Sequence, residues 1–132
     1  MKYILMMHGN RVGWDGYAKW PKEDLQRNIE FMRAFNKELR DSGVFVATEG
    51  LAWPDQAKIV RAGTDGEPMT DGVFPESKEF LARYWIINVE SAEQAYRIAA
   101  RASSAPCPGG QRGSMAVEVR PVLSGAPKEL LR

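Results

Sequence analysis

The chain has 132 residues, a length typical of one domain, so we expect no second independent hydrophobic core. Hydrophobic residues make up 44% of the chain and charged residues 27%, a balance typical of folded proteins and unlike that of disordered chains. Eighteen basic and seventeen acidic residues give a net charge of +1, which provides no field to attract nucleic acid.

Membrane spans, disulfides and metal sites are also not expected. No apolar run approaches the roughly 20 residues that cross a bilayer, and Met1–Met7 is too short and too lightly charged for a signal peptide. We therefore expect a cytoplasmic protein without membrane contact. Cys107 is the only cysteine and His8 the only histidine, so an internal disulfide and a structural zinc site are both excluded. We expect neither a metal nor a cofactor.

The predicted elements follow one another as strand, long connection, helix, strand, hairpin, strand, helix and strand. In chain order they cover Lys2–Met7, Gly9–Trp20, Pro21–Arg40, Val44–Thr48, Lys58–Thr70, Phe80–Val89, Ser91 to the residues before Pro106, and Met115–Val122.

Both helices have clear sequence signals. The first carries apolar residues at helical spacing, namely Leu25, Ile29, Met32, Phe35 and Leu39. Glu23 and Asp24 favour its positive end, and Gly43 provides a left-handed cap at its other end. The second helix begins with the capping box formed by Ser91 and Gln94. Its apolar side chains are mostly alanines, which would let its backbone approach a sheet closely.

This order predicts a split βαβ plan, an antiparallel sheet with both helices on one face. The other face also carries apolar residues, because Tyr84 and Ile86 alternate with Trp85 and Ile87 along one strand. An apolar sheet face exposed to water is rare in a soluble monomer. We therefore expect a two-fold homodimer, sheet against sheet, with a cavity between the sheets.

The segment Asp71–Glu79, Asp-Gly-Val-Phe-Pro-Glu-Ser-Lys-Glu, resembles the signature of the DGPF branch of the YCII-related family. Met1-Lys2-Tyr3, Trp85-Ile86-Ile87 and Val117–Pro121 are also similar to this family. The resemblance implies a ferredoxin-like α+β fold assembled as a dimeric α+β barrel, in a family whose biochemical role is mostly unestablished. We expect one such domain over residues 1–122 and a C-terminal tail over residues 123–132.

This chain departs from the family pattern at two places. Val73 and Pro75 stand where the motif usually has proline and a small residue. The wider group is associated with a histidine near the start of the first helix, and Pro21–Asp24 contains none.

His8 and Asp71 are the candidate catalytic residues. A lone imidazole at a cavity mouth can act as a general acid or base, and it can equally be a strand-end residue bonded to backbone or solvent. Asp71 begins a tight turn, where it either shapes the turn or lines a site. Phe74 is expected to anchor the same turn by burial.

Five residues are candidates for ligand binding: Trp14, Arg61, Trp85, Glu118 and Arg120. Glu118 and Arg120 share one face of a strand, where they either line the dimer cavity or form an edge or surface charge pair with Arg61 or Arg83 nearby. Trp14 belongs to an aromatic connection that either covers a ligand or packs against the first helix.

The sequence therefore predicts a homodimer that binds a small organic molecule and carries out cofactor-free acid–base chemistry, an elimination or isomerisation. The alternative is a non-enzymatic module that senses a ligand or binds another protein.

Overall fold

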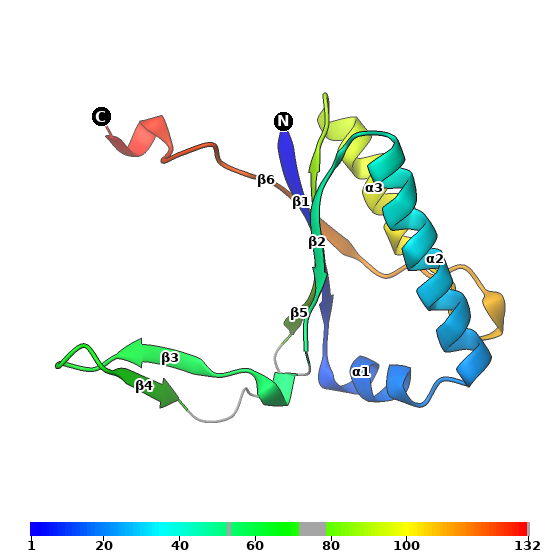
Figure 1. Cartoon of the computed structure of the whole chain (residues 1–132), viewed down its shortest axis with the longest axis horizontal. Helices are drawn as coiled ribbons and strands as arrows, with labels where there is room; N and C mark the ends of the chain where they lie inside the picture. Colours follow the sequence, from blue (N-terminus) through cyan, green and yellow to red (C-terminus); the bar gives the residue numbers. More distant parts are fainter. Residues whose placement is uncertain (53, 72–78, 132) are drawn as a thin grey trace.

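The computed structural model describes residues 1–52, 54–71 and 79–131. Four strands form the main sheet, and two longer helices lie on one side of it (Figure 1). The strands are β1 (Lys2–Gly9), β2 (Phe45–Gly50), β3 (Ile59–Ala62), β4 (Pro68–Asp71), β5 (Phe80–Asn88) and β6 (Val117–Pro121). The helices are α1 (Arg11–Ala18), α2 (Lys22–Asp41) and α3 (Ala92–Ser103), and the short 3₁₀ turns are η1 (Pro54–Gln56), η2 (Pro108–Gly110) and η3 (Lys128–Leu131).

The main sheet has the order β2-β5-β1-β6, and every neighbouring pair is antiparallel. Since β1-α2-β2 and β5-α3-β6 each return to the same sheet, this is the ferredoxin-like α+β arrangement. The predicted ferredoxin-like α+β fold with an antiparallel sheet is confirmed, and its assembly as a dimeric barrel stays a prediction. A register shift in the β1–β5 pairing lies between Met7 and His8, near the end of β1.

The hydrophobic core lies between the sheet and the helices. Alternate residues of the central strands point toward the helices and are buried, as expected for a half-covered sheet. They are Tyr3, Leu5 and Met7 of β1 with Trp85 and Ile87 of β5.

The two long helices contact the sheet in different ways. α2 contributes large side chains, and the Phe35 ring, 2% exposed, meets the Trp85 ring edge-on at 5.4 Å between centroids. α3 contributes the small residues Ala95, Ala99 and Ala102, at most 6% exposed. The layer between the helices and the sheet is therefore filled by large side chains under α2, and under α3 by the close approach of the helix backbone to the sheet.

The ends of α3 agree with the predicted capping box in part. The Ser91 hydroxyl accepts a hydrogen bond from the Gln94 backbone N–H at 3.1 Å. The Gln94 side-chain oxygen accepts from the N–H of Glu90, one residue before the cap, also at 3.1 Å. Both bonds satisfy donors at the helix start, with the second shifted by one residue from the expected pattern.

The connection between the first strand and the first predicted helix is itself partly helical. The Asn10 side chain accepts from the Gly13 N–H at 2.8 Å and begins α1, where we expected a loop. Gly13 and Gly16 weaken the helix propensity of this segment, which explains the difference. The cap and the packing of Trp14 and Tyr17 compensate.

The hairpin β3–β4 extends away from the main sheet on the side opposite α2 and α3, as does the C-terminal segment (Figure 1). All four residues of β3 are exposed, including Ile59 and Val60. The hairpin itself was predicted, and Asp71, the first residue of the signature segment, pairs with Ile59 in it. Phe74 lies outside the described residues.

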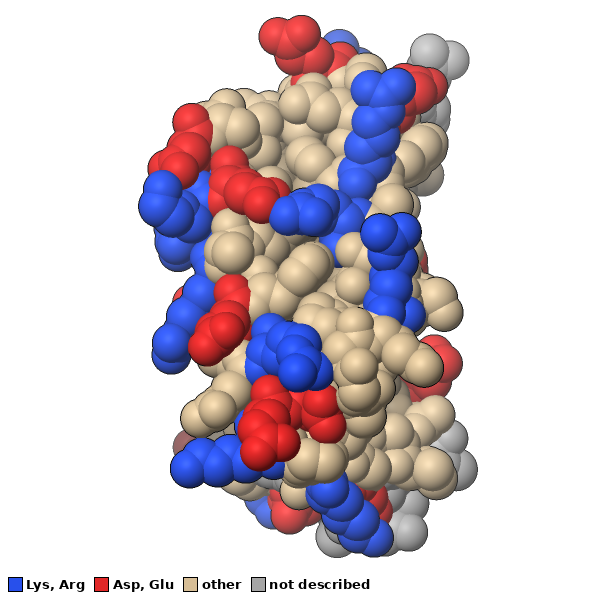
Figure 2. Space-filling view, turned by 90° about the vertical axis from the view of Figure 1, so that its right-hand side faces the viewer, with Lys and Arg blue, Asp and Glu red and all other residues tan. Residues whose placement is uncertain are grey.

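The outer face of the helices carries basic and acidic side chains interspersed, with no patch of one sign dominating the view (Figure 2). This agrees with the small net charge of the chain. Within the described ranges, no helix is both long and apolar enough to cross a membrane.

Candidate functional site

The main cavity has a volume of about 570 Å³ and lies on the helix side of the sheet. The end of β1, the aromatic side of α1, the inner face of α2 and the connection from α3 to β6 surround it. We expected a cavity between the sheets of a dimer, and this one is formed within a single chain. Its lining includes Met7, His8, Trp14, Tyr17, Trp20, Asn28, Met32, Arg33, Asn36, Arg83, Pro106 and Cys107.

Three aromatic residues form one wall of the cavity. The rings of Trp14 and Tyr17 are 6.3 Å apart with 27° between their planes, and Tyr17 and Trp20 are 4.9 Å apart. The Trp14 ring also meets Phe80 edge-on at 6.0 Å. The aromatic segment therefore lines the cavity and packs against β5 through Phe80, and its role in covering a ligand stays a prediction.

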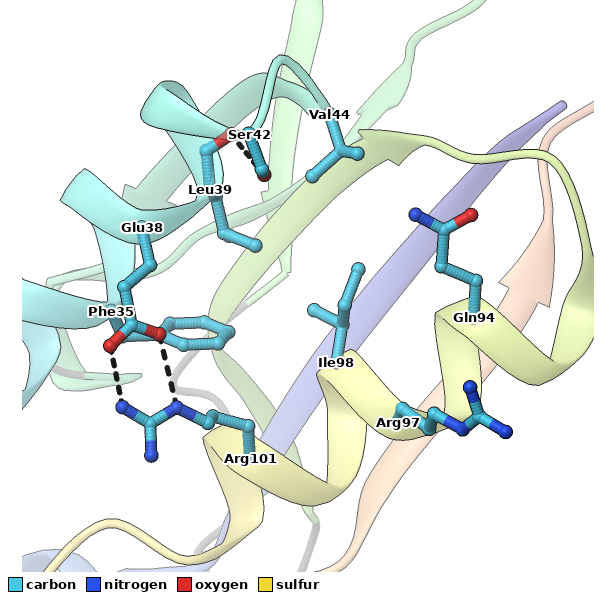
Figure 3. A pocket seen from close by; sticks show the side chains of 9 residues that line it. All are labelled: Phe35, Glu38, Leu39, Ser42, Val44, Gln94, Arg97, Ile98 and Arg101. Carbon is cyan, nitrogen blue, oxygen red and sulfur yellow. Dashed lines mark hydrogen bonds and ion pairs between the residues drawn. The ribbon is translucent and has the colours of Figure 1, made fainter.

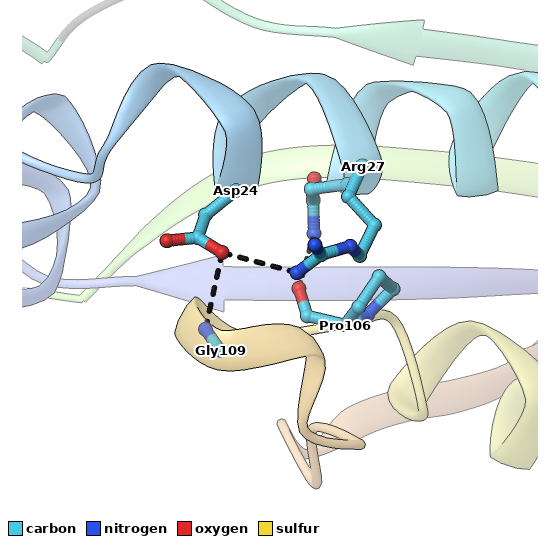
Figure 4. Close-up of polar contacts among 5 residues, drawn as sticks. Asp24, Arg27, Pro106 and Gly109 are labelled. Atoms are coloured by element: carbon cyan, nitrogen blue, oxygen red, sulfur yellow. Dashed lines mark hydrogen bonds and ion pairs between the residues drawn. The ribbon is translucent and has the colours of Figure 1, made fainter.

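A second wall comes from the connection that follows α3, and α2 holds it in place (Figure 4). The Asp24 carboxylate is buried and accepts from the Gly109 N–H at 3.0 Å and from Arg27 at 3.1 Å. The Asn28 side chain donates to the carbonyl of Pro106 at 3.1 Å. Asp24 thus does more than complement the positive end of the helix, because it also fixes the cavity wall.

His8 and Glu118 are brought together by the pairing of β1 with β6. The two strands place Met6 opposite Glu118, and His8 Nε2 lies 3.1 Å from Glu118 Oε1. Their side chains are 33% and 47% exposed, so water reaches the pair. No partner for His8 was predicted from the sequence, and this carboxylate provides one. Arg120 Nε lies 3.8 Å from the other carboxylate oxygen of Glu118, on the face away from the helices.

The remaining predicted residues lie apart from this pair. Trp85 is fully buried, and its indole N–H donates to the Asn36 side chain at 2.8 Å, so it supports the cavity wall from behind. Arg61 is exposed on β3, opposite Met69. Asp71 ends β4, and its side chain is not among those described. The roles assigned to these residues stay predictions.

Asn36 and Arg83 line the cavity and were not among the candidate site residues predicted from the sequence. Asn36 stands four residues after Met32 on the apolar side of α2, so a polar residue interrupts the buried stripe. Arg83 precedes Trp85 and Ile87 at alternate positions, which places its charge on the helix side of the sheet. A polar residue inside an apolar pattern was the available signal in both cases.

A second hollow of about 320 Å³ lies between α2 and α3 (Figure 3). Its floor is apolar, and the Glu38 carboxylate accepts two hydrogen bonds from Arg101 beside it, at 2.6 and 3.0 Å. These bonds lower the pKa of Glu38 and raise that of Arg101. The charges neutralise one another, so the main cavity is the better candidate site.

Among the residues that the structure describes, no group of three or more His, Cys, Asp or Glu side chains is arranged to hold a metal ion. The groups available for chemistry at the main cavity include the His8 imidazole, a cysteine thiol, serine and tyrosine hydroxyls, amides, arginines and aromatic rings.

A ferredoxin-like α+β domain with a cavity at one end of its helical layer is the class of protein that these features define. The model of the YCII-related domain matches residues 1–123, and the chain belongs to that family. A comparison with curated proteins gives no match. The DGPF branch and the boundary at residue 122 stay predictions.

Proposed function

We propose that this chain is a homodimeric protein that binds a small organic molecule in its main cavity and uses His8 for cofactor-free acid–base chemistry. The cavity volume of about 570 Å³ is in the range that holds small molecules. Its walls combine aromatic surface with a few polar groups, as ligand sites do. The single observation that carries the proposal is that His8, one of the residues lining this cavity, has the Glu118 carboxylate 3.1 Å from its Nε2.

The His8–Glu118 pair has the composition of an acid–base unit. An imidazole gains and loses a proton near neutral pH, so it can accept a proton from a substrate and return it. A carboxylate at Nε2 favours the neutral tautomer with its proton on that nitrogen, which leaves Nδ1 as the basic atom. An elimination or isomerisation that begins by removing a proton from carbon requires such a base.

The binding part of the proposal can be tested by native mass spectrometry of the purified protein, followed by identification of any small molecule that stays bound. The chemical part can be tested with that molecule in D₂O. If His8 is the base, NMR will show exchange of a carbon-bound proton that is lost in His8→Gln and reduced in Glu118→Gln.

Arg120→Gln is the matched control, since Arg120 follows Glu118 on the same strand face and also touches its carboxylate. Full exchange in His8→Gln would remove the catalytic role of His8. Asp71→Asn tests the other candidate catalytic residue in the same assay, and unchanged exchange would remove Asp71 from the mechanism.

The open face of the main sheet supports the homodimer. Ile4 pairs with Ile86 and Met6 with Tyr84 across β1 and β5, and all four side chains stay half-buried on the side without helices. A second copy is the cover that a two-fold dimer would provide.

Light scattering should give the mass of a dimer for the natural chain and of a monomer for Ile86→Glu. Tyr96→Glu is the control, because Tyr96 is a large exposed side chain on α3, on the helix side. A monomeric natural chain would contradict the dimer.

The second candidate function is a non-enzymatic module that senses a ligand or binds a protein partner. The same open sheet face favours it, since an apolar face can serve assembly without chemistry. Binding of the identified molecule without proton exchange in the natural chain would support this alternative over catalysis.

A further inference from the structure

The charged side chains that line the main cavity all have one sign. Within the described part of the chain, Arg33 and Arg83 line it, together with His8, and no aspartate or glutamate does. The Glu118 carboxylate does not line the cavity and is engaged by His8 and Arg120. A cavity that is otherwise apolar and has this charge favours an anion.

Arg83 is held in a defined position. It is half-buried on the helix side of β5, and its guanidinium carbon lies 5.8 Å from the centroid of the Trp85 ring. The end of β2 passes close by, since a Cβ atom at Gly50 would lie only 3.1 Å from an Arg83 side-chain nitrogen. The Arg83 guanidinium therefore lies between the Trp85 ring and the backbone at Gly50, where the absence of a side chain leaves room for it.

No carboxylate of the described residues pairs with Arg83 or with Arg33. Cations that do pair with carboxylates among the described residues include Arg27, Lys37, Arg101, Arg120 and His8. A half-buried guanidinium loses hydration, and a bound anion can replace it with two parallel hydrogen bonds. A carboxylate suits a guanidinium because its two oxygens can accept these two parallel hydrogen bonds.

The rest of the cavity suits an apolar or aromatic body. The rings of Trp14, Tyr17 and Trp20 present flat surfaces, and Met32 from α2 offers an adaptable side chain. A ligand with one charged end and one flat apolar part would use both kinds of surface.

We propose that the main cavity takes a small organic acid, whose carboxylate binds Arg83 and whose apolar or aromatic body lies against the α1 aromatic wall. The inference rests on the proposed function and names its ligand class. It also places the acid so that a carbon near the carboxylate lies in the same cavity as His8.

The test is calorimetric titration of the full-length protein with matched pairs of phenylalkanoic acids and their primary amides. The two members of a pair have the same shape and differ in charge. The natural chain should bind each acid roughly tenfold more tightly than its amide, or better, as expected for a hydrogen bond to a charged group. Arg83→Gln should remove this preference, and Arg97→Gln, which deletes a charge at the separate hollow between α2 and α3, should keep it.

Arg83→Lys is a second variant that keeps the positive charge, and it should retain part of the preference even if Arg83→Gln is poorly folded. Equal binding of acid and amide by the natural chain would overturn the organic-acid inference while leaving the small-molecule function intact. An unchanged preference in a folded Arg83→Gln protein would also overturn it. Absence of binding across the whole series would remove the proposed function together with the inference.

Discussion

Replacing Asp24 with alanine should destabilise the protein because it detaches one wall of the cavity from α2. Asp24 is only 9% exposed, and its carboxylate accepts from the Gly109 N–H and from Arg27. A bond to a buried carboxylate contributes about 1.5 to 3 kcal/mol, but Gly109 is exposed, so water can partly replace the acceptor. The Arg27 pair is half in solvent and adds at most about 0.5 kcal/mol. We expect a total loss of about 2 kcal/mol.

Glu23→Ala is the matched control for this loss. Glu23 also lies in the first turn of α2, but it is exposed, and the hydrogen bonds to Gly109 and Arg27 are made by Asp24 instead. Its removal costs only the interaction with the helix dipole, about 0.3 to 1 kcal/mol.

Urea denaturation followed by circular dichroism gives both free energies of unfolding. Amide exchange by NMR should also show faster exchange at Gly109 in Asp24→Ala but not in Glu23→Ala. Equal free-energy losses in the two variants, with unchanged exchange at Gly109, would refute the reasoning.

Two further predictions concern packing and pH. In Gly113→Ala the new Cβ would lie 2.5 Å from the carbonyl oxygen of Ala105, so we expect a loss of about 1 to 3 kcal/mol by urea denaturation. Gly16→Ala in α1 is the control, because its new Cβ would meet nothing within 4 Å, and it should stabilise the protein by up to about 1 kcal/mol. A Gly113→Ala protein as stable as the natural chain would contradict the prediction. Because Arg101 lowers the pKa of Glu38 in the folded state, their contribution is present above the ordinary glutamate pKa and is lost as pH falls through the lowered one. Both groups are about half exposed, so the free energy of unfolding of Glu38→Gln, measured across an acid titration, should differ from that of the natural chain by only a few tenths of a kcal/mol. This difference should shrink toward low pH, and a difference that grows there would contradict the prediction.

Local sequence patterns were sufficient to predict the sheet and the two long helices. The apolar spacing of α2, the Ser91 cap and the alternation around Trp85 each depend on residues close together in the chain. The same kind of signal was present for α1, in Asn10 and in the three-residue spacing of Trp14, Tyr17 and Trp20, but two glycines made a loop the natural expectation. Intrinsic propensity was outweighed there by a cap and by tertiary packing.

The site could be predicted only in part, because it depends on contacts between distant residues. His8 and Glu118 were both named as candidates, yet their contact requires the register between β1 and β6. The position of the cavity depends on where α1 lies and on the bonds from Asp24 and Asn28 to the connection after α3. None of these follows from periodicity or composition.

The unequal packing of the two long helices has a consequence for how the chain tolerates change. Positions on α2 such as Phe35 should accept other large side chains and reject small ones, because truncation leaves an empty volume against Trp85. Positions on α3 such as Ala99 should show the reverse, since any longer side chain would push the helix off the sheet. A library of single substitutions, selected for folded protein, would thus give opposite size preferences on two neighbouring helices. Paired exchanges that move bulk from Phe35 to Ala99 would show how far the volume of this layer can be redistributed.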